Sequence, residues 1–128
     1  MDERGKLFYN NDFNAVGVKR VYFIENAELD FKRGWQGHKI EQRWFSVVQG
    51  RFKIQVIKID NWDKPASNHN IQEFILDAES LDILHVPKGY ITSLQSLDKS
   101  ARLMAMSDYR LGEIEDEQRF EQTYFKQK

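Results

Sequence analysis

The chain has 128 residues, no cysteine, and a formal net charge of −1 from 19 Lys and Arg against 20 Asp and Glu. These numbers exclude a disulfide framework, a thiol nucleophile and a thiolate metal site, and they leave no basic stripe for nucleic acid. No apolar run approaches the roughly 18 residues of a membrane helix and the N-terminus is polar, so we expect a cytoplasmic protein with one domain over residues 1–128 and no membrane partner.

β-Branched and aromatic residues alternate with turn signals along most of the chain, which is typical of short strands. The first predicted strand covers residues 16–25, and Arg33-Gly34 indicates a turn after a polar connection. Further strands are predicted at residues 43–48, 52–59, 71–76, 81–86, 90–97 and 101–108. In residues 52–59 the apolar side chains change faces after Val56, which indicates a bulge or burial on both faces. Seven or eight short strands favour a barrel or jelly roll over a parallel α/β sheet.

The pattern changes after Glu113. Acidic residues at 113–117 indicate a solvated face, and Phe120, Tyr124 and Phe125 follow at helical spacing. This region is predicted to form a short C-terminal helix or an ordered tail.

Two stretches resemble incomplete versions of the two cupin motifs. The first has Gln36-Gly37-His38 where those motifs have His-x-His, and Glu41 follows; the second begins at Pro87 and ends in Thr92 instead of His. Gln36 and His38 lie two residues apart, so on a strand they share one face. Because neither Gln nor Thr is a usual transition-metal ligand, we expect no metal and no other cofactor.

The chain as a whole resembles the sugar-nucleotide cupins. The resemblance is strongest to the 3,4-ketoisomerases that act on dTDP-4-keto-6-deoxyglucose and extends to the dTDP-4-dehydrorhamnose 3,5-epimerases. It is carried by Arg4-Gly5-Lys6-Leu7, Lys19-Arg20-Val21-Tyr22-Phe23-Ile24, the stretch from Arg33 to Gln42, and Ser107-Asp108-Tyr109. It implies an all-β, cupin-type jelly-roll barrel that holds a nucleotide-linked sugar. It also implies a homodimer, and pairing of the N-terminal segment and strand 18–24 across a two-fold axis would cover an exposed edge.

The function implied is an isomerase or epimerase of a dTDP-4-keto-6-deoxyhexose in deoxysugar and surface polysaccharide biosynthesis. Such a reaction needs a base, and the first histidine of the family motif is Gln36, which cannot abstract a proton. His38 is therefore the predicted catalytic base, with Gln36 as a hydrogen-bond donor to substrate or oxyanion. Two alternatives stay open: a catalytically silent cupin that binds a sugar nucleotide, and an assembly subunit that pairs with an enzyme.

The remaining site residues are assigned by their chemistry. Arginine binds phosphate in a two-pronged way, so Arg4 and Arg33 are the predicted pyrophosphate ligands, with Lys39 third. Gln42, at the end of the first motif, is also assigned to substrate binding. The candidates for stacking on the nucleotide base or for proton delivery are Tyr22, Tyr90, Trp35 and Trp44. Of the other histidines, His69 is expected to be exposed to solvent and His85 to be structural.

Overall fold

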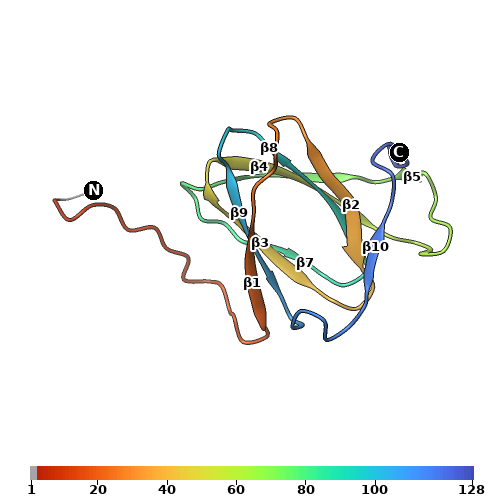
Figure 1. The fold of residues 1–128 in the computed structure, drawn as a ribbon, viewed down its shortest axis with the longest axis horizontal. Helices are drawn as coiled ribbons and strands as arrows, with labels where there is room; N and C mark the ends of the chain where they lie inside the picture. The colour runs from red at the N-terminus through yellow and green to blue at the C-terminus, as the bar shows by residue number, and fades with distance from the viewer. Residues whose placement is uncertain (1–2) are drawn as a thin grey trace.

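The computed structural model describes residues 3–128, which form eleven β-strands and no helix (Figure 1). The strands are β1 Arg20–Ile24, β2 Lys32–His38, β3 Arg43–Gln49, β4 Arg51–Lys58, β5 Asn68–His69, β6 Gln72–Asp77, β7 Leu84–Val86, β8 Tyr90–Ser96, β9 Arg102–Ser107, β10 Glu117–Arg119 and β11 Lys126–Gln127. The prediction of an all-β chain is confirmed. No helix among residues 3–128 is long and apolar enough to cross a membrane.

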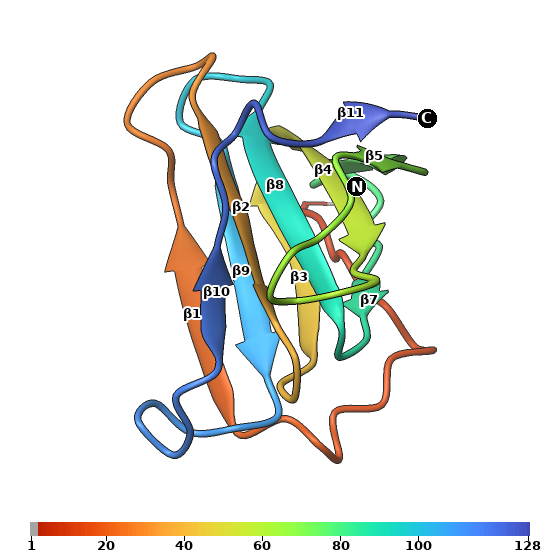
Figure 2. The ribbon, with the colours of Figure 1, turned by 90° about the vertical axis from the view of Figure 1, so that its right-hand side faces the viewer.

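The strands form two facing sheets and a small third one. One sheet has the order β1-β9-β3-β7, the other has the order β10-β2-β8-β4-β6, and β11 pairs with β5. Figures 1 and 2 show the two larger sheets as the walls of an open barrel. The main core between them includes Phe45 and Leu103 from one sheet and Phe52 and Ile54 from the other, all fully buried. The space between the walls is therefore packed with apolar side chains over much of its length.

Strand β4 is buried on both faces, which explains its change of pattern after Val56. Ile54 and Val56 belong to the main core, whereas Ile57 and Ile59 belong to a second cluster on the outer side of the sheet. The register of β4 with β8 runs without a shift from Phe52 to Lys58, so no bulge separates the two patterns.

The Arg33-Gly34 pair lies inside β2, and the predicted turn there is wrong. Glycine is required at two positions of β2 by close approach to β8. A Cβ on Gly34 would lie 2.3 Å from the Thr92 carbonyl oxygen, and one on Gly37 would lie 2.6 Å from Ile91 Cα. Gly34 also has a φ of 137°, which L side chains rarely adopt. These glycines thus position β2, and with it Gln36 and His38, against the neighbouring strand.

The C-terminal segment is an ordered tail and contains no helix. It pairs with β2 through β10 and with β5 through β11. Phe120 and Phe125 are packed in the second cluster against Trp35 and Trp62, so their spacing reflects an aromatic cluster. His69 is buried beneath this tail, with its ring against Phe125, and the expectation of an exposed His69 is wrong.

Candidate functional site

A polar cavity of about 210 Å³ opens between the two sheets on the side where β1 faces β2 and β10. Its lining side chains are mostly from inward-facing strand positions: Arg20, Tyr22, Ile24, Arg33, Gln36, Arg43, Phe45, Thr92, Leu94, Leu111, Glu117 and Arg119. Four of these are arginines and one is a carboxylate, so the cavity favours an anionic ligand. A smaller recess shares Gln36, Arg43 and Thr92 with it and leads to His38.

His38 is buried at this inner recess, with 6% of its surface exposed. Its Nδ1 lies 3.4 Å from Glu41 Oε2 and 3.7 Å from Asp116 Oδ2. Within residues 3–128 neither ring nitrogen of His38 has a hydrogen-bond partner. Buried polar atoms normally have partners, and within residues 3–128 Nε2 has neither a hydrogen bond nor an ion pair, so it is the ring atom through which His38 would contact a ligand.

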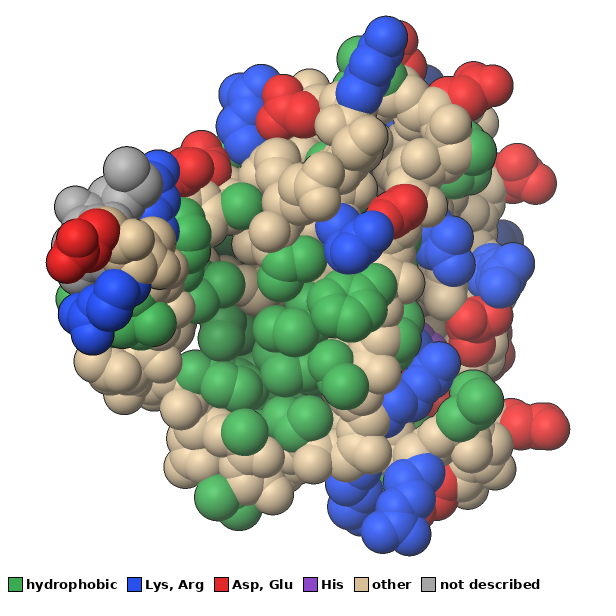
Figure 3. Space-filling model, turned by 60° about the vertical axis from the view of Figure 1, so that its left-hand side comes forward, with side chains coloured by type: hydrophobic (Ala, Val, Ile, Leu, Met, Phe, Trp, Pro, Cys, Tyr) green, Lys and Arg blue, Asp and Glu red, His purple; other side chains and the backbone are tan. Residues whose placement is uncertain are grey.

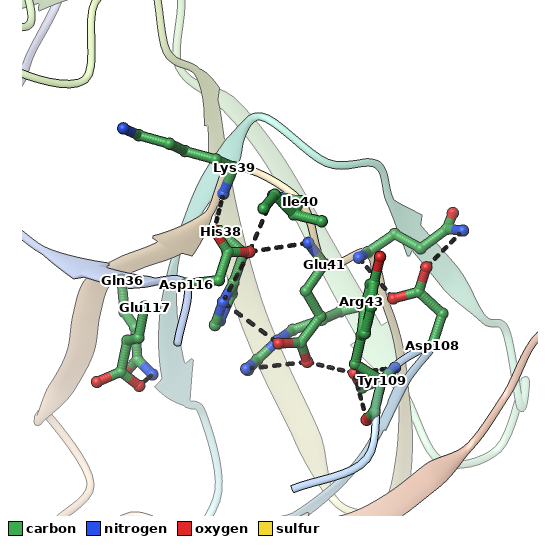
Figure 4. A network of polar contacts seen from close by, with 12 residues as sticks. Gln36, His38, Lys39, Ile40, Glu41, Arg43, Asp108, Tyr109, Asp116 and Glu117 are labelled. Carbon is green, nitrogen blue, oxygen red and sulfur yellow. Dashed lines mark hydrogen bonds and ion pairs between the residues drawn. The ribbon is translucent and has the colours of Figure 1, made fainter. Parts of the chain in front are cut away.

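Asp116 holds the loop that follows His38 in place (Figure 4). Its carboxylate accepts hydrogen bonds from the backbone amides of Lys39 at 3.0 Å, Ile40 at 2.9 Å and Glu41 at 2.8 Å. The Asp116 residue is 7% exposed, so the interpretation of the acidic stretch 113–117 as a solvated face is wrong at this position. One buried carboxylate therefore fixes both the loop and the polar surroundings of His38.

A chain of polar contacts continues from Glu41 to Tyr22. The Ser107 hydroxyl donates to Glu41 Oε1, and Arg43 Nη2 lies 3.5 Å from the same oxygen. Arg43 Nη1 donates to the Tyr22 hydroxyl at 2.6 Å, and Arg43 Nε is buried without a partner within residues 3–128. Arg20 packs on the Tyr22 ring at 4.3 Å. Arg43 thus retains a donor at the cavity for a ligand oxygen.

The surroundings of His38 favour its neutral form. Burial lowers the pKa of His38 below its ordinary value of 6.5, and the Arg43 guanidinium lowers it further, against the opposing effects of Glu41, Asp116 and Glu117. A neutral imidazole at neutral pH is the form that accepts a proton.

The side chains of His38, Glu41 and Asp116 place one ligand atom each within 4.8 Å of one another, which raises the question of a metal ion. Both Asp116 oxygens already accept backbone amides, and Glu41 accepts from Ser107 beside the Arg43 cation. This donor set fits a hydrogen-bonded network better than a divalent cation. The expectation of a metal-free site stays a prediction.

The structure brings five of the residues assigned from the sequence to the cavity and recess: Gln36, His38, Tyr22, Tyr90 and Arg33. Three others are not among the residues that line these two spaces. Arg4 is exposed on the N-terminal segment, Lys39 lies 6.0 Å from the Trp62 ring, and Gln42 bonds to Asp108 and His85.

The two tryptophan candidates are also placed elsewhere. Trp35 is 2% exposed within the second cluster and is not available for stacking on a nucleotide base. Trp44 is half-buried and stacks on His85 with ring centroids 5.2 Å apart, consistent with the structural role expected of His85.

Sequence reasoning missed five residues at the site: Arg20, Arg43, Asp116, Glu117 and Arg119. The alternation of inward and outward side chains along a strand could have identified two of them. Arg20 is two residues from Tyr22, and Arg43 is two residues from the core residue Phe45, so each shares the inward face of its neighbour. The other three lie in a segment without a clear strand pattern.

Comparison with known proteins gives one family and a set of similar folds. A family model described as "FdtA: WxcM-like, C-terminal" matches residues 1–125. No curated protein matches the chain.

Three solved structures show the similarity in fold. A mutant of the 3,4-ketoisomerase QdtA from Thermoanaerobacterium thermosaccharolyticum, in complex with TDP-4-keto-6-deoxyglucose, is 20% identical with a TM-score of 0.68, covering 94% of this chain and 80% of that one. A dTDP-4-dehydrorhamnose 3,5-epimerase from Bacillus anthracis with TDP and PPi bound is 20% identical with a TM-score of 0.67, covering 88% and 70%. A 3,4-ketoisomerase from Helicobacter canadensis is 21% identical with a TM-score of 0.64, covering 88% and 80%. The predicted cupin-type jelly roll is confirmed by this similarity.

Proposed function

Because the chain belongs to the FdtA family, described as WxcM-like, C-terminal, we propose that it binds a dTDP-4-keto-6-deoxyhexose and moves protons on the sugar as an isomerase or epimerase. The observation that carries the proposal is the buried His38, which lines the recess adjoining an arginine-lined cavity and whose ring nitrogens make no hydrogen bond within residues 3–128. The reaction would serve deoxysugar and surface polysaccharide biosynthesis.

The sugar is proposed to occupy the inner end of the cavity. A 4-keto group acidifies the hydrogen on the adjacent carbon, and a neutral imidazole removes such a proton. The resulting enediolate carries negative charge on oxygen, and the free Nε–H of Arg43 together with the amide of Gln36 are the donors that would stabilise it. His38, Arg43 and Gln36 then act on one face of the sugar ring.

The diphosphate is proposed to lie at the cavity mouth. Arg20, Arg33 and Arg119 line this space from β1, β2 and β10. Guanidinium groups match phosphate oxygens in geometry and keep their charge at all physiological pH values. This arrangement would orient the nucleotide outward and the keto sugar toward His38.

Replacing Arg33 by Gln should weaken dTDP binding by about 10-fold to 100-fold, the effect of losing one charge-assisted hydrogen bond of about 1.5–3 kcal/mol. Isothermal calorimetry with dTDP measures the affinity. Arg102→Gln is the matched control, because Arg102 pairs with Glu25 and does not line the cavity. Equal affinities of wild type and Arg33→Gln would remove Arg33 from the diphosphate site.

We also propose that the protein is a homodimer through the sheet that contains β1. Strand β1 is an edge strand of that sheet, and Val21 and Phe23 are each 58% exposed on its outer side. Figure 3 shows apolar side chains gathered on this face beside the N-terminal segment. Exposed apolar patches of this kind mark protein interfaces. Light scattering at micromolar concentration should give twice the chain mass of 15.3 kDa, and a monomer mass would refute the dimer.

Two measurements separate the proposal from its alternatives. Binding of a dTDP-sugar distinguishes an isomerase or a silent binding protein from an assembly subunit. Exchange of a sugar hydrogen with solvent then distinguishes an enzyme from a silent binding protein. Gln36 in place of the motif histidine is the observation that keeps the silent alternative open.

A further inference from the structure

We propose that Glu117 is a second proton-transferring group, which carries a proton between the two sugar oxygens while His38 carries one between the two carbons. The proposal rests on the proposed function and narrows it to a 3,4-ketoisomerisation. It concerns a residue in a segment where sequence patterns indicated only a solvated face.

Strand pairing places Glu117 beside the catalytic residues assigned from the sequence. In the antiparallel pair of β10 and β2, Glu117 lies opposite His38 and Arg119 lies opposite Gln36. Directly paired residues on adjacent strands have Cβ atoms about 4.5–5.5 Å apart, and residues two apart share a face. Glu117, Arg119, Gln36 and His38 therefore form one group of side chains facing the cavity and its recess.

The Glu117 carboxylate is held at the cavity by two donors. Gln36 Nε2 donates to Glu117 Oε1, and Arg119 Nε donates to Glu117 Oε2 at 2.8 Å (Figure 4 shows the Gln36 contact). The Gln36 amide cannot accept and release a proton, whereas the carboxylate to which it donates can. The titratable group thus stands next to the position where the motif would have placed a histidine.

Two other titratable groups of the site, Glu41 and Tyr22, are already engaged by neighbouring side chains. The Glu41 side chain is 9% exposed and is already engaged by Ser107 and Arg43. The Tyr22 hydroxyl accepts a hydrogen bond from Arg43. The Glu117 side chain is 42% exposed and lines the cavity directly. Among the described side chains of this cavity, Glu117 is therefore the carboxylate that a sugar hydroxyl can reach.

A 3,4-ketoisomerisation requires two balanced proton movements. His38 removes the hydrogen of C3 as a proton, the C3–H electron pair forms the C3–C4 double bond, and the carbonyl electrons move to O4. The O3–H bond then breaks and its electron pair forms the new C3 carbonyl, while the C3–C4 double-bond pair moves to C4 and takes the proton from His38 to form the C4–H bond. Glu117 accepts the O3 proton and delivers a proton to O4. C3 is oxidised and C4 is reduced within one molecule, so no external oxidant is needed.

If His38 moves the carbon-bound proton and Glu117 moves the oxygen-bound proton, loss of Glu117 should slow product formation more than it slows hydrogen exchange at C3. Wild type, Glu117→Gln and Glu117→Gln combined with Gln36→His are incubated with dTDP-4-keto-6-deoxyglucose in heavy water, and proton NMR follows deuterium at C3 and formation of the 3-keto product. In Glu117→Gln, product formation should fall by about 100-fold or more, the range of one acid–base group, while C3 exchange falls by less than about 10-fold. Gln36→His should restore product formation, because it returns a titratable group to the same place. Glu121→Gln, an exposed acidic residue outside the cavity and recess, is the control.

The outcomes separate this proposal from the function on which it rests. Product formation at the wild-type rate in Glu117→Gln, or equal losses of exchange and product, would overturn the role of Glu117 alone. Exchange without any 3-keto product in the wild type would also overturn it while leaving an epimerase possible. A wild type that shows neither exchange nor 3-keto product would overturn both proposals.

Discussion

Replacing His38 by Gln should lower the rate of hydrogen exchange on the keto sugar by about 10²–10⁴-fold, the usual contribution of a general base, and should leave dTDP affinity nearly unchanged. Glutamine fills a similar volume and keeps hydrogen-bonding capacity, so the cavity is preserved while the titratable nitrogen is lost. His38→Ala should abolish turnover. Exchange rates from NMR and dTDP affinities from calorimetry measure the two effects separately.

The pH dependence of exchange provides a second readout for His38. Exchange needs the neutral imidazole, and the pKa of His38 lies below 6.5 because of its burial and the Arg43 cation. The rate should therefore stay level as the pH falls from 8 to about 6.5 and decline only below that value. His85→Gln is the matched control, because His85 packs on Trp44 and does not line the cavity or the recess. Exchange unchanged in His38→Ala would refute the assignment of the base.

Replacing Asp116 by Ala should lower the free energy of unfolding by about 3 kcal/mol or more. Its carboxylate accepts the backbone amides of Lys39, Ile40 and Glu41, and each hydrogen bond to a charged group contributes about 1.5–3 kcal/mol. Asp116→Asn keeps one acceptor oxygen and should lose less. Urea denaturation followed by fluorescence measures the change.

Glu115→Gln provides the control for this prediction. Glu115 is the exposed neighbour of Asp116, so its change should stay within about 0.5 kcal/mol. If Asp116→Ala does not fold, Asp116→Asn still tests the prediction, because it should be less stable than wild type and should lose exchange through the displaced loop. An Asp116→Asn protein with wild-type stability and wild-type exchange would show that the carboxylate does not position His38.

The parts of the fold that follow from local rules could be predicted from the sequence. Alternation in β4 indicated two-sided burial or a bulge, and the structure has two-sided burial without a shift of register against β8. Alternation also placed Gln36 and His38 on one face, and both line the same recess. The same rule was not applied to Arg20, which is two residues from Tyr22 and also faces inward, so that residue was missed.

The parts that depend on distant contacts could not be predicted in this way. Gly34 indicated a turn because glycine is common in turns. In the structure, glycine is needed at this position because the backbone of Thr92, on another strand, lies too close for a side chain. Asp116 lies in an acidic run and is 75 residues or more from the amides it accepts. His69 is buried because the C-terminal tail covers it. In each case the partner that decides burial is remote in the sequence.

One measurement tests the proposed chemistry most directly. The wild-type protein is incubated with dTDP-4-keto-6-deoxyglucose in heavy water, with His38→Gln as the parallel sample, and proton NMR follows the hydrogens on the carbons next to the carbonyl. We predict that the wild type incorporates deuterium at C3 and that His38→Gln does so about 10²–10⁴-fold more slowly. Wild-type protein that binds dTDP but neither incorporates deuterium nor converts the keto sugar, or His38→Gln that exchanges as fast as wild type, would contradict the proposal that His38 acts as a base on a nucleotide-linked keto sugar.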